Sequence, residues 1–326
     1  LESLLLQSLP PDQDEVVIVD NISGDQTAAV AACYPQFRYV LEKEVGLSHA
    51  RNRGIREARG DIVAFIDDDA EADPDWLKSL LDIYDRNPNA WAVGGKVLPI
   101  WDAPRPEWLT ERYHRSLSLV DWGDQIRPLA WPDRIIGTNC SFRKKAFQKI
   151  GRFDTKLGRM GNLMLGNEDT EIQERIHRLG HQVVYHPGAV VHHHVPASRM
   201  TREYFQKRDQ GTRYSQHILS LRQDNQDEEH INQVIDHLRQ ETETTEQKKR
   251  YQNSLHQSQQ AFAQFHNKHR GERCVIIGNG PSLNEMDLAP LQDEITFGLN
   301  RIYLGFDKWD FRPSYYVSRS EEHTSE

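Results

Sequence analysis

The segment from Ile62 to Leu77, IVAFIDDDAEADPDWL, constrains the fold of this chain more than any other. An apolar run leads directly into three carboxylates, Asp67, Asp68 and Asp69, and the pattern predicts a following helix with proline in its first turn. Adjacent carboxylates at the end of a buried strand repel one another, and a hard cation such as Mg²⁺ or Mn²⁺ relieves that repulsion. A solvated turn that caps the helix is the alternative interpretation.

A second apolar run, EVVIVD from Glu15 to Asp20, also ends in an acidic turn, which contains Asp25. In open α/β sheets, ligands bind beyond the carboxyl ends of the strands. We therefore expect Asp20 and Asp25 to converge on one crevice with Asp67 and Asp69.

Between these two runs, the sequence GLSHARNRG at residues 46–54 predicts the start of an arginine-rich helix. Arg51 lies in its first turns and offers a cationic donor suited to a phosphate-bearing ligand. An exposed basic helix face is the alternative for these arginines.

Five motifs follow one another in the order VDNISGDQT, GLSHARNRGIREARGDIVAFIDDD, GTNCSFRKKAF, GRFDTKLG and GNEDTEIQERIHRLGHQVVYHPGAVVHHHVP. This ordered set, within residues 1–215, resembles glycosyltransferase family 2. The resemblance implies a GT-A fold, an α/β domain whose Rossmann-like mixed sheet has helices on both faces. It also implies a nucleotide-sugar donor and Mn²⁺ or Mg²⁺ as cofactor.

The resemblance assigns roles to the acidic residues. The IDDD segment matches the DxD motif, which makes Asp67 a nucleotide or ribose contact and Asp69 the metal ligand. Asp20 and Asp25 match positions that hold the nucleobase and ribose. Asp68 and Arg51 complete the set of candidates for donor binding.

Glu168 and Asp169 are the candidates for the reacting side of the site. They follow a glycine-rich stretch, and the apolar positions Ile172 and Ile176 predict a helix that begins with these two acids. Replacing a nucleotide leaving group by an acceptor hydroxyl requires a base for the hydroxyl proton. By resemblance Asp169 is that base and Glu168 contacts the acceptor or supports the site; helix capping is the alternative.

His192, His193 and His194 follow the strand-like run VVYHPGAVV. An imidazole at this place would complete the metal shell begun by Asp69. The resemblance maps the metal ligand onto His193, whereas a histidine-rich strand end on the surface is the alternative.

Composition excludes some classes of function. With 326 residues, a mean hydropathy of -0.74 and only strand-sized apolar runs, the chain has no predicted transmembrane segment. A net charge of -9 without a basic stripe argues against a nucleic acid partner. Three widely spaced cysteines without a CxxC pattern favour buried free thiols in a reducing compartment. We therefore expect a cytoplasmic location, either free in the cytoplasm or peripheral to the inner membrane.

The chain begins with LESLLLQSL, which predicts an amphipathic helix. A GT-A domain is expected to open with a strand ahead of that helix. We therefore expect the first strand of the domain to be missing.

The second half of the chain changes character after residue 215. Residues 216–270 are polar and charged, which predicts a helical connector, with disorder as the alternative. From Arg273, CVIIGNGPSL and the later FGLNR resemble the nucleotide-binding start of family 42 sialyltransferases and related flagellin-modifying transferases. In that resemblance Asn279, Ser282 and Asn300 contact a cytidine nucleotide.

Residues 271–318 are accordingly interpreted as an incomplete nucleotide-binding α/β domain. The last eight residues, RSEEHTSE at 319–326, match the conceptual translation of a widely used sequencing adapter. We expect them not to be natural protein.

The sequence thus predicts a metal-dependent, inverting glycosyltransferase that moves a sugar from a UDP-, GDP- or dTDP-sugar to a hydroxyl of a glycan or glycoprotein acceptor. A nucleotidyltransferase with a similar acidic site, and a sugar- or nucleotide-binding protein without turnover, are the alternatives. A haloacid-type phosphatase is disfavoured because Ala70 and Glu71 follow the aspartates where Thr or Val is expected.

Overall fold

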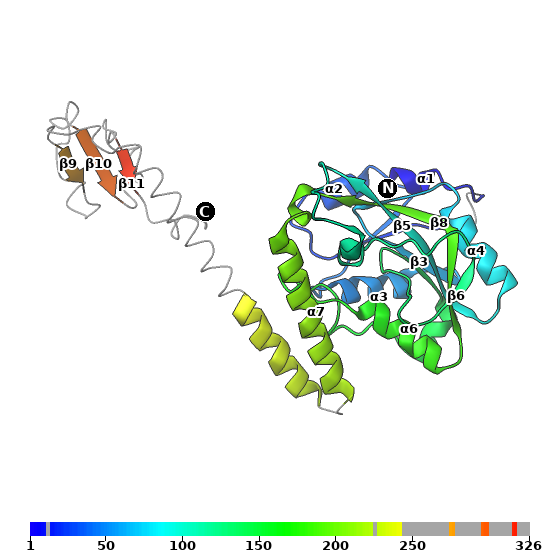
Figure 1. Cartoon of the computed structure of the whole chain (residues 1–326). Coiled ribbons are helices and arrows are strands. Elements are labelled where there is room, and N and C mark those ends of the chain that lie inside the picture. The colour runs from blue at the N-terminus through cyan, green and yellow to red at the C-terminus, as the bar shows by residue number, and fades with distance from the viewer. Residues whose placement is uncertain (11–13, 224–226, 243–273, 278–294, 300–314, 318–326) are drawn as a thin grey trace. The chain divides into compact units, whose positions relative to one another are not determined.

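The computed structural model divides into two compact units, Leu1–Thr242 and Glu243–Glu326. The structure describes residues 1–10, 14–223, 227–242, 274–277, 295–299 and 315–317. The first unit is an α/β domain in which helices surround a central sheet (Figure 1). It extends to Thr242, further than residue 215, where the predicted domain ends.

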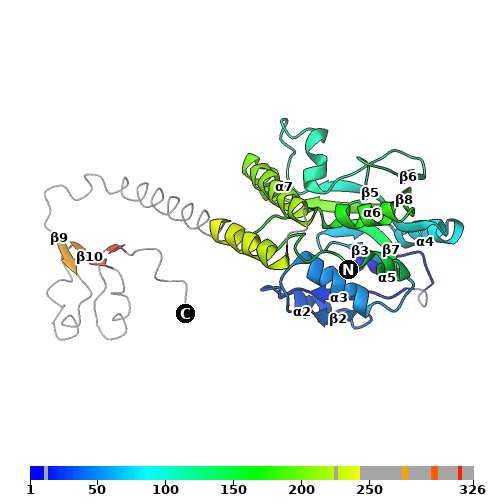
Figure 2. The same ribbon diagram turned by 90° about the horizontal axis from the view of Figure 1, so that it is seen from below.

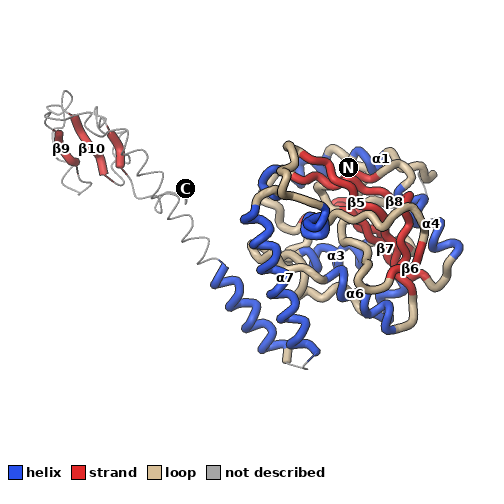
Figure 3. The backbone as a smooth tube through the Cα atoms, in the orientation of Figure 1, coloured by secondary structure: helices blue, strands red, loops and turns tan. Residues whose placement is uncertain are grey.

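The centre of the first unit is a six-stranded mixed sheet (Figure 3). Its order is β3-β7-β5-β8-β4, and β6 pairs antiparallel with β8. Strands β5 and β8 are parallel, whereas β7 runs antiparallel to both β3 and β5. The strands are β3 (Ile62–Ile66), β4 (Ala70–Ala72), β5 (Ala90–Trp101), β6 (Arg127–Leu129), β7 (Asn139–Arg143) and β8 (Gln182–Val195).

Helices cover both faces of this sheet because successive residues of its strands point to opposite sides. Ala92 of β5 packs with Ile172 and Ile176 of α6, whereas its neighbour Val93 packs with Trp76 of α4. The α/β class and the mixed sheet with helices on both faces are confirmed. The helices are α1 (Glu2–Leu5), α2 (Thr27–Ala32), α3 (Leu47–Glu57), α4 (Trp76–Arg86), α5 (Phe147–Ile150), α6 (Glu168–Arg178) and α7 (Arg202–Gln223), with 3₁₀ turns η1 (Glu111–Leu117), η2 (Lys144–Ala146) and η3 (Ala197–Arg199).

Strands β1 (Val17–Asp20) and β2 (Arg38–Leu41) form a separate parallel pair. This pair lies with α2 and α3 along one edge of the unit (Figure 2). Among the described residues, β1 pairs only with β2 and β3 only with β7, so each has one edge without a strand partner. A cavity of about 1140 Å³ is lined by both edges, residues 16–20 and 62–66.

The end of the first unit is a helical pair. Residues 228–242 form a helix, and Ile231, Ile235 and Leu238 pack with Ile218 of α7 and Leu165. The predicted helical connector thus begins as part of the first unit. Helix α7 runs across the predicted boundary at residue 215 without interruption.

In the second unit, the described residues form a parallel three-stranded sheet of order β11-β10-β9, with β9 (Cys274–Ile277), β10 (Ile295–Leu299) and β11 (Tyr315–Val317). The β9 strand coincides with the predicted strand after Arg273. Asn279, Ser282, Asn300 and the adapter-like tail lie outside the described residues. No helix in the described part of the chain is long and apolar enough to cross a membrane.

Candidate active site

A cavity of about 190 Å³ collects candidate residues from four distant segments of the chain. The acidic run after β3, the first turn of α6, strand β8 and helix α3 all contribute to its lining. Of the predicted residues, it is lined by Arg51, Asp67, Asp68, Asp69, Glu168, Asp169 and His193.

Arg51 connects the two acidic segments. Its Nη1 lies 2.8 Å from Oε1 of Glu168 and its Nη2 lies 3.5 Å from Oδ1 of Asp67, with Arg51 only 5% exposed. Burial alone would lower the pKa of Arg51, but the charges of Glu168 and Asp67 raise it above its ordinary value. The alternative of an exposed basic face therefore does not apply to Arg51.

Gly137 is required for this arrangement. A Cβ atom added at Gly137 would lie 2.5 Å from Nη2 of Arg51, so any larger residue would displace the guanidinium. The neighbouring Thr138 hydroxyl donates to Oδ2 of Asp67 at 2.6 Å. Both residues belong to the segment GTNCSF that precedes and opens β7.

Glu168 and Asp169 have different surroundings although they are adjacent. Glu168 is buried. Burial and the negative charge of Asp169 raise the pKa of Glu168, and the ion pair with Arg51 acts in the opposite direction. Asp169 is half-buried; its Oδ2 accepts from the backbone amide of Gly137 at 2.9 Å and its Oδ1 from that of Thr170 at 2.7 Å. Asp169 is therefore the member of the pair with the greater access to the cavity.

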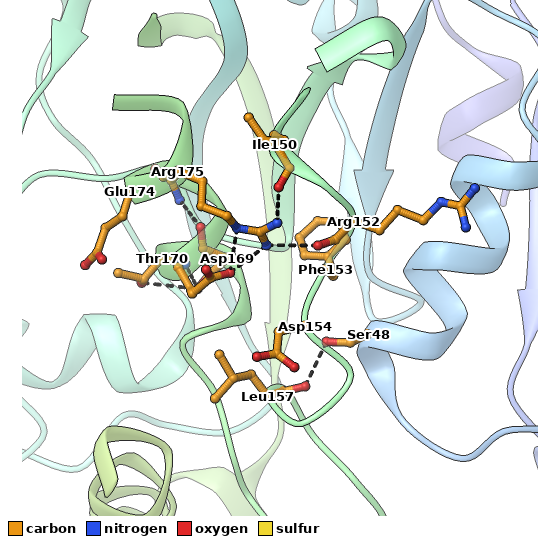
Figure 4. A network of polar contacts seen from close by, with 12 residues as sticks. Ser48, Ile150, Arg152, Phe153, Asp154, Leu157, Asp169, Thr170, Glu174 and Arg175 are labelled. Carbon is orange, nitrogen blue, oxygen red and sulfur yellow. Dashed lines mark hydrogen bonds and ion pairs between the residues drawn. The ribbon is translucent and has the colours of Figure 1, made fainter. Parts of the chain in front are cut away.

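A network of polar contacts ties α6, which carries Asp169, to the segment that precedes it (Figure 4). Arg175 of α6 donates to the backbone carbonyls of Ile150 and Arg152, and it is paired with Glu171 at 2.6 Å. The glycine-rich loop is attached to α3, because Ser48 donates to the carbonyl of Leu157 at 2.7 Å. These contacts attach α6 to residues 150–152 and the glycine-rich loop to α3.

The alternation of β8 separates the three histidines. His193 is 3% exposed and points into the cavity, with Nε2 3.2 Å from Oδ1 of Asp69. His192 pairs with Asp73 at 2.9 Å, and His194 pairs with both Glu71 and Asp102 at 3.0 Å. A strand period of two therefore selects the middle histidine, as the resemblance implied.

Arg199 of η3 holds the pair of Asp69 and His193. Its Nη2 lies 2.8 Å from Oδ2 of Asp69, and its Nη1 lies 3.2 Å from Nε2 of His193. Burial would raise the pKa of Asp69, but hydrogen bonds and charges from His193 and Arg199 lower it to about 2. The Asp69 side chain is therefore a carboxylate that is stabilised by neighbouring positive charge.

Asp69 and His193 supply the oxygen and nitrogen donors that suit Mn²⁺. Within the part of the chain that the structure describes, no group of three or more His, Cys, Asp or Glu side chains could hold a metal ion. The residues fit an ion that takes one or two protein ligands and completes its shell with ligand phosphates and water.

Asp20 and Asp25 lie apart from this cavity. They line the larger cavity beside β1, which shares Arg51, Asp67 and Asp68 with the smaller one. The Tyr39 hydroxyl donates to Asp20 at 2.6 Å and lowers the pKa of that carboxyl. The structure therefore brings the predicted residues into two adjoining cavities rather than one crevice.

Sequence reasoning did not predict the other residues of the smaller cavity. The polar residues among them include Thr138, Arg159, Arg199 and Arg208. Thr138 lies inside a motif that carries the resemblance, so its position was a usable signal. The three arginines follow no local pattern in the sequence and enter the cavity only through the fold.

Comparison with known proteins identifies the family. Residues 1–151 match the family model described as glycosyl transferase family 2. The chain is 30% identical over 233 residues to a glucosyl-dolichyl phosphate glucuronosyltransferase of Haloferax volcanii, covering 68% of this chain and 71% of that protein. The chain belongs to glycosyltransferase family 2. It is accordingly an enzyme, a transferase of glycosyl groups.

One more curated protein and one solved structure are also similar to this chain. The succinoglycan biosynthesis protein ExoM of Rhizobium meliloti is 30% identical over 218 residues, covering 64% of this chain and 66% of that protein. A mannosyltransferase of Pyrobaculum calidifontis, solved in complex with GDP-Man and Mn²⁺, is 23% identical and covers 67% of this chain and 58% of that one, with a TM-score of 0.46.

Proposed function

We propose that this family 2 enzyme is a metal-dependent, inverting glycosyltransferase that moves a sugar from a nucleotide-sugar donor to an acceptor hydroxyl. The observation that supports the proposal best is the convergence of Asp67, Asp69, Asp169 and His193 on one cavity. A candidate contact for the sugar donor, a candidate base and two candidate metal ligands therefore line the same cavity.

The donor nucleotide is assigned to the side of the site where the two cavities adjoin. Asp20 and Asp25 are proposed to contact the base and ribose, and Asp67 and Asp68 the ribose or nucleotide. Arg51 is proposed to act in donor binding by keeping Asp67 in place through their ion pair. A UDP-, GDP- or dTDP-sugar is the expected donor class.

Asp69 and His193 are proposed to hold the divalent cation, Mn²⁺ or Mg²⁺. When bound, such an ion stabilises the negative charge of the departing nucleoside diphosphate. Arg199 lies against both residues and neutralises Asp69. These contacts keep the acidic cavity compatible with an anionic donor.

Asp169 is proposed to accept the proton of the acceptor hydroxyl as that oxygen attacks the anomeric carbon. Its two hydrogen bonds from backbone amides orient the carboxylate. A single base and a single displacement give inversion at the anomeric carbon. Glu168 supports the site through Arg51 rather than by touching the acceptor.

The test is a panel of UDP-, GDP- and dTDP-sugars with Mn²⁺, with release of the nucleoside diphosphate as the readout. One donor is expected to be turned over, and Asp69→Ala is expected to abolish Mn²⁺-dependent donor binding. His193→Ala is expected to weaken metal use less, because Asp69 and the diphosphate oxygens remain.

The panel also separates the alternatives. Release of pyrophosphate from a nucleoside triphosphate and a sugar 1-phosphate, assayed in parallel, would instead identify a nucleotidyltransferase. Donor binding without turnover would identify a binding protein. Metal-dependent affinity that is unchanged in Asp69→Ala would remove Asp69 from the site.

Two finer assignments remain part of the proposal. The free thiols of Cys33 and Cys140 suit the cytoplasm, although Cys33 is exposed rather than buried as expected. The parallel pairing of β9 and β10 is compatible with a nucleotide-binding unit resembling family 42 sialyltransferases. Binding of CMP to the full chain, measured by calorimetry, tests that second assignment.

A further inference from the structure

The four arginines that line the smaller cavity fall into two pairs. Arg51 and Arg199 each lie 2.8 Å from a carboxylate oxygen. Arg159 and Arg208 form no ion pair with a carboxylate in the part of the chain that the structure describes. Arg208 donates to the carbonyl of Met164 at 3.3 Å, and Arg159 contacts the Tyr204 hydroxyl at 3.5 Å.

Arg208 is only partly satisfied by protein partners. The Met164 carbonyl accepts from its Nη1, but its Nε is buried and, among the described residues, has no hydrogen-bond partner. Burial lowers the pKa of Arg208, and the positive charge of Arg159 acts in the same direction. A buried N–H without a partner costs free energy, and a second cation nearby adds to that cost. An anion between the two guanidinium groups would offset both.

The pair lies beside the candidate base. Arg159 belongs to the glycine-rich loop before α6, and Arg208 of α7 lies against Gly166, where an added Cβ would be 3.8 Å from its Nη1. The carboxylates of Glu168 and Asp169 both act on Arg208 electrostatically. By contrast, the proposed metal ligands extend from β3 and β8.

We propose that Arg159 and Arg208 form an anion subsite that binds a phosphate group of the acceptor. This inference rests on the proposed function, because it places the acceptor next to Asp169. Guanidinium groups match the oxygens of a phosphate in bidentate geometry. The cavity also contains five carboxylates, so a negatively charged acceptor needs cations that those carboxylates do not already neutralise.

The experiment is calorimetric titration of the full chain with glucose 1-phosphate and with octyl phosphate, each in the presence of Mn²⁺ and saturating UDP or GDP. Glucose and octanol are the neutral counterparts. At least one phosphate probe is expected to bind and its neutral counterpart not to bind. The two probes distinguish a sugar phosphate from a lipid phosphate as the source of the group.

Arg159→Gln and Arg208→Met are each expected to weaken binding of the phosphate probe at least tenfold, with nucleotide affinity unchanged within about twofold. Arg208→Lys keeps the charge but lacks the planar pair of N–H donors, so an intermediate loss of phosphate affinity is expected. Arg213→Gln is the matched control, because Arg213 is exposed on the same helix and pairs with Asp209 at 2.7 Å.

Stability separates binding from a structural role. If Arg208 serves an anion, Arg208→Met should unfold at the same temperature as the wild type or higher in phosphate-free buffer. The phosphate probe should raise the unfolding temperature of the wild type only. A lower unfolding temperature of Arg208→Met without phosphate would overturn the proposal.

Two binding results would also overturn it. Unchanged phosphate affinity in a variant that combines Arg159→Gln with Arg208→Met would exclude the subsite. A parallel loss of nucleotide affinity would assign the two arginines to the donor-binding site. Absence of nucleotide binding with intact, arginine-dependent phosphate binding would instead reject the proposed function and keep the anion subsite.

Discussion

At the scale of single residues, the neighbours Glu168 and Asp169 differ in burial and therefore in role. Glu168 points into the protein and neutralises buried Arg51, while Asp169 lines the cavity with its two oxygens held by backbone amides. A charge that is buried and paired contributes to structure, whereas a half-buried carboxylate remains available for proton transfer.

We therefore expect Asp169→Asn to lower turnover by roughly two or more orders of magnitude while donor affinity is retained. Glu168→Gln removes the negative charge that neutralises buried Arg51, so it is expected to lower the unfolding temperature more than the turnover. Steady-state kinetics and donor titration of both variants check this. A matching loss of donor affinity in Asp169→Asn would make that residue part of the nucleotide site.

Asp20 gives a prediction for pH dependence. The Tyr39 hydroxyl holds the pKa of this carboxyl below its ordinary value. A carboxyl with a lowered pKa stabilises the folded state above its unfolded pKa of about 3.9, and that stability is lost as pH falls through the folded-state pKa. Tyr39→Phe should thus lower the free energy of unfolding near neutral pH and leave it unchanged in strong acid.

Urea unfolding across the pH range measures this difference, and Asp20→Asn serves as the control because it removes the titrating group. Introducing Tyr39→Phe into Asp20→Asn should leave no pH-dependent difference. A penalty that stays constant down to the acid limit would show that Tyr39 stabilises by packing instead.

At the scale of elements, β1 and β3 line one cavity, and in the described residues each has an edge without a strand partner. Glu15 before β1 accepts hydrogen bonds from the amides of Arg59 and Gly60 before β3, and Asp20 and Asp67 lie at the other strand ends on the same cavity. The two strands therefore run in the same direction. Their facing edges present backbone groups that only another strand would satisfy in full.

A five-residue apolar strand of Val and Ile, joined ahead of Leu1 by a short polar turn, is expected to fill this position. Leu1 lines the cavity, so the connection is short. Pairing and burial should raise the unfolding temperature by about 5 °C, which corresponds to roughly 2 kcal/mol in a domain of this size.

The matched control is the same extension with prolines at alternate positions, because proline cannot donate to a strand. Hydrogen exchange at Ile18 and Ala64 reports pairing directly. Equal unfolding temperatures for the two extensions would show that the cavity does not accept a strand.

At the scale of the whole molecule, the first unit is predicted to fold by itself when it ends at Thr242. Ile231, Ile235 and Leu238 are buried against Ile218, so they belong to its core. Each such side chain contributes about 1.5–3 kcal/mol on burial. A chain of residues 1–226 should accordingly unfold at least roughly 5 °C below a chain of residues 1–242.

Thermal unfolding followed by circular dichroism compares the two chains, and donor binding to the longer one checks that the site is intact. Equal unfolding temperatures would mean that the helix at residues 228–242 is not part of the cooperative unit.

The sequence by itself determined what depends on short-range pattern. The apolar run that becomes β3, the acids that follow it, and the helix that opens at Glu168 are all readable from alternation and helical spacing, and the order of motifs identified the family. His193 follows from the family resemblance, because a strand period of two separates it from its flanking histidines but does not tell which face lines the cavity.

Only the tertiary structure decided which of these residues share a cavity. The contact of Arg51 with Glu168 joins residues 117 positions apart, and Arg199 and Arg208 reach the site from segments whose local sequence predicts nothing about it. The tertiary structure also placed Asp20 and Asp25 on a second cavity. Local propensity acts over a few residues, whereas ion pairs and buried cations depend on the path of the whole chain, so no local pattern encodes them.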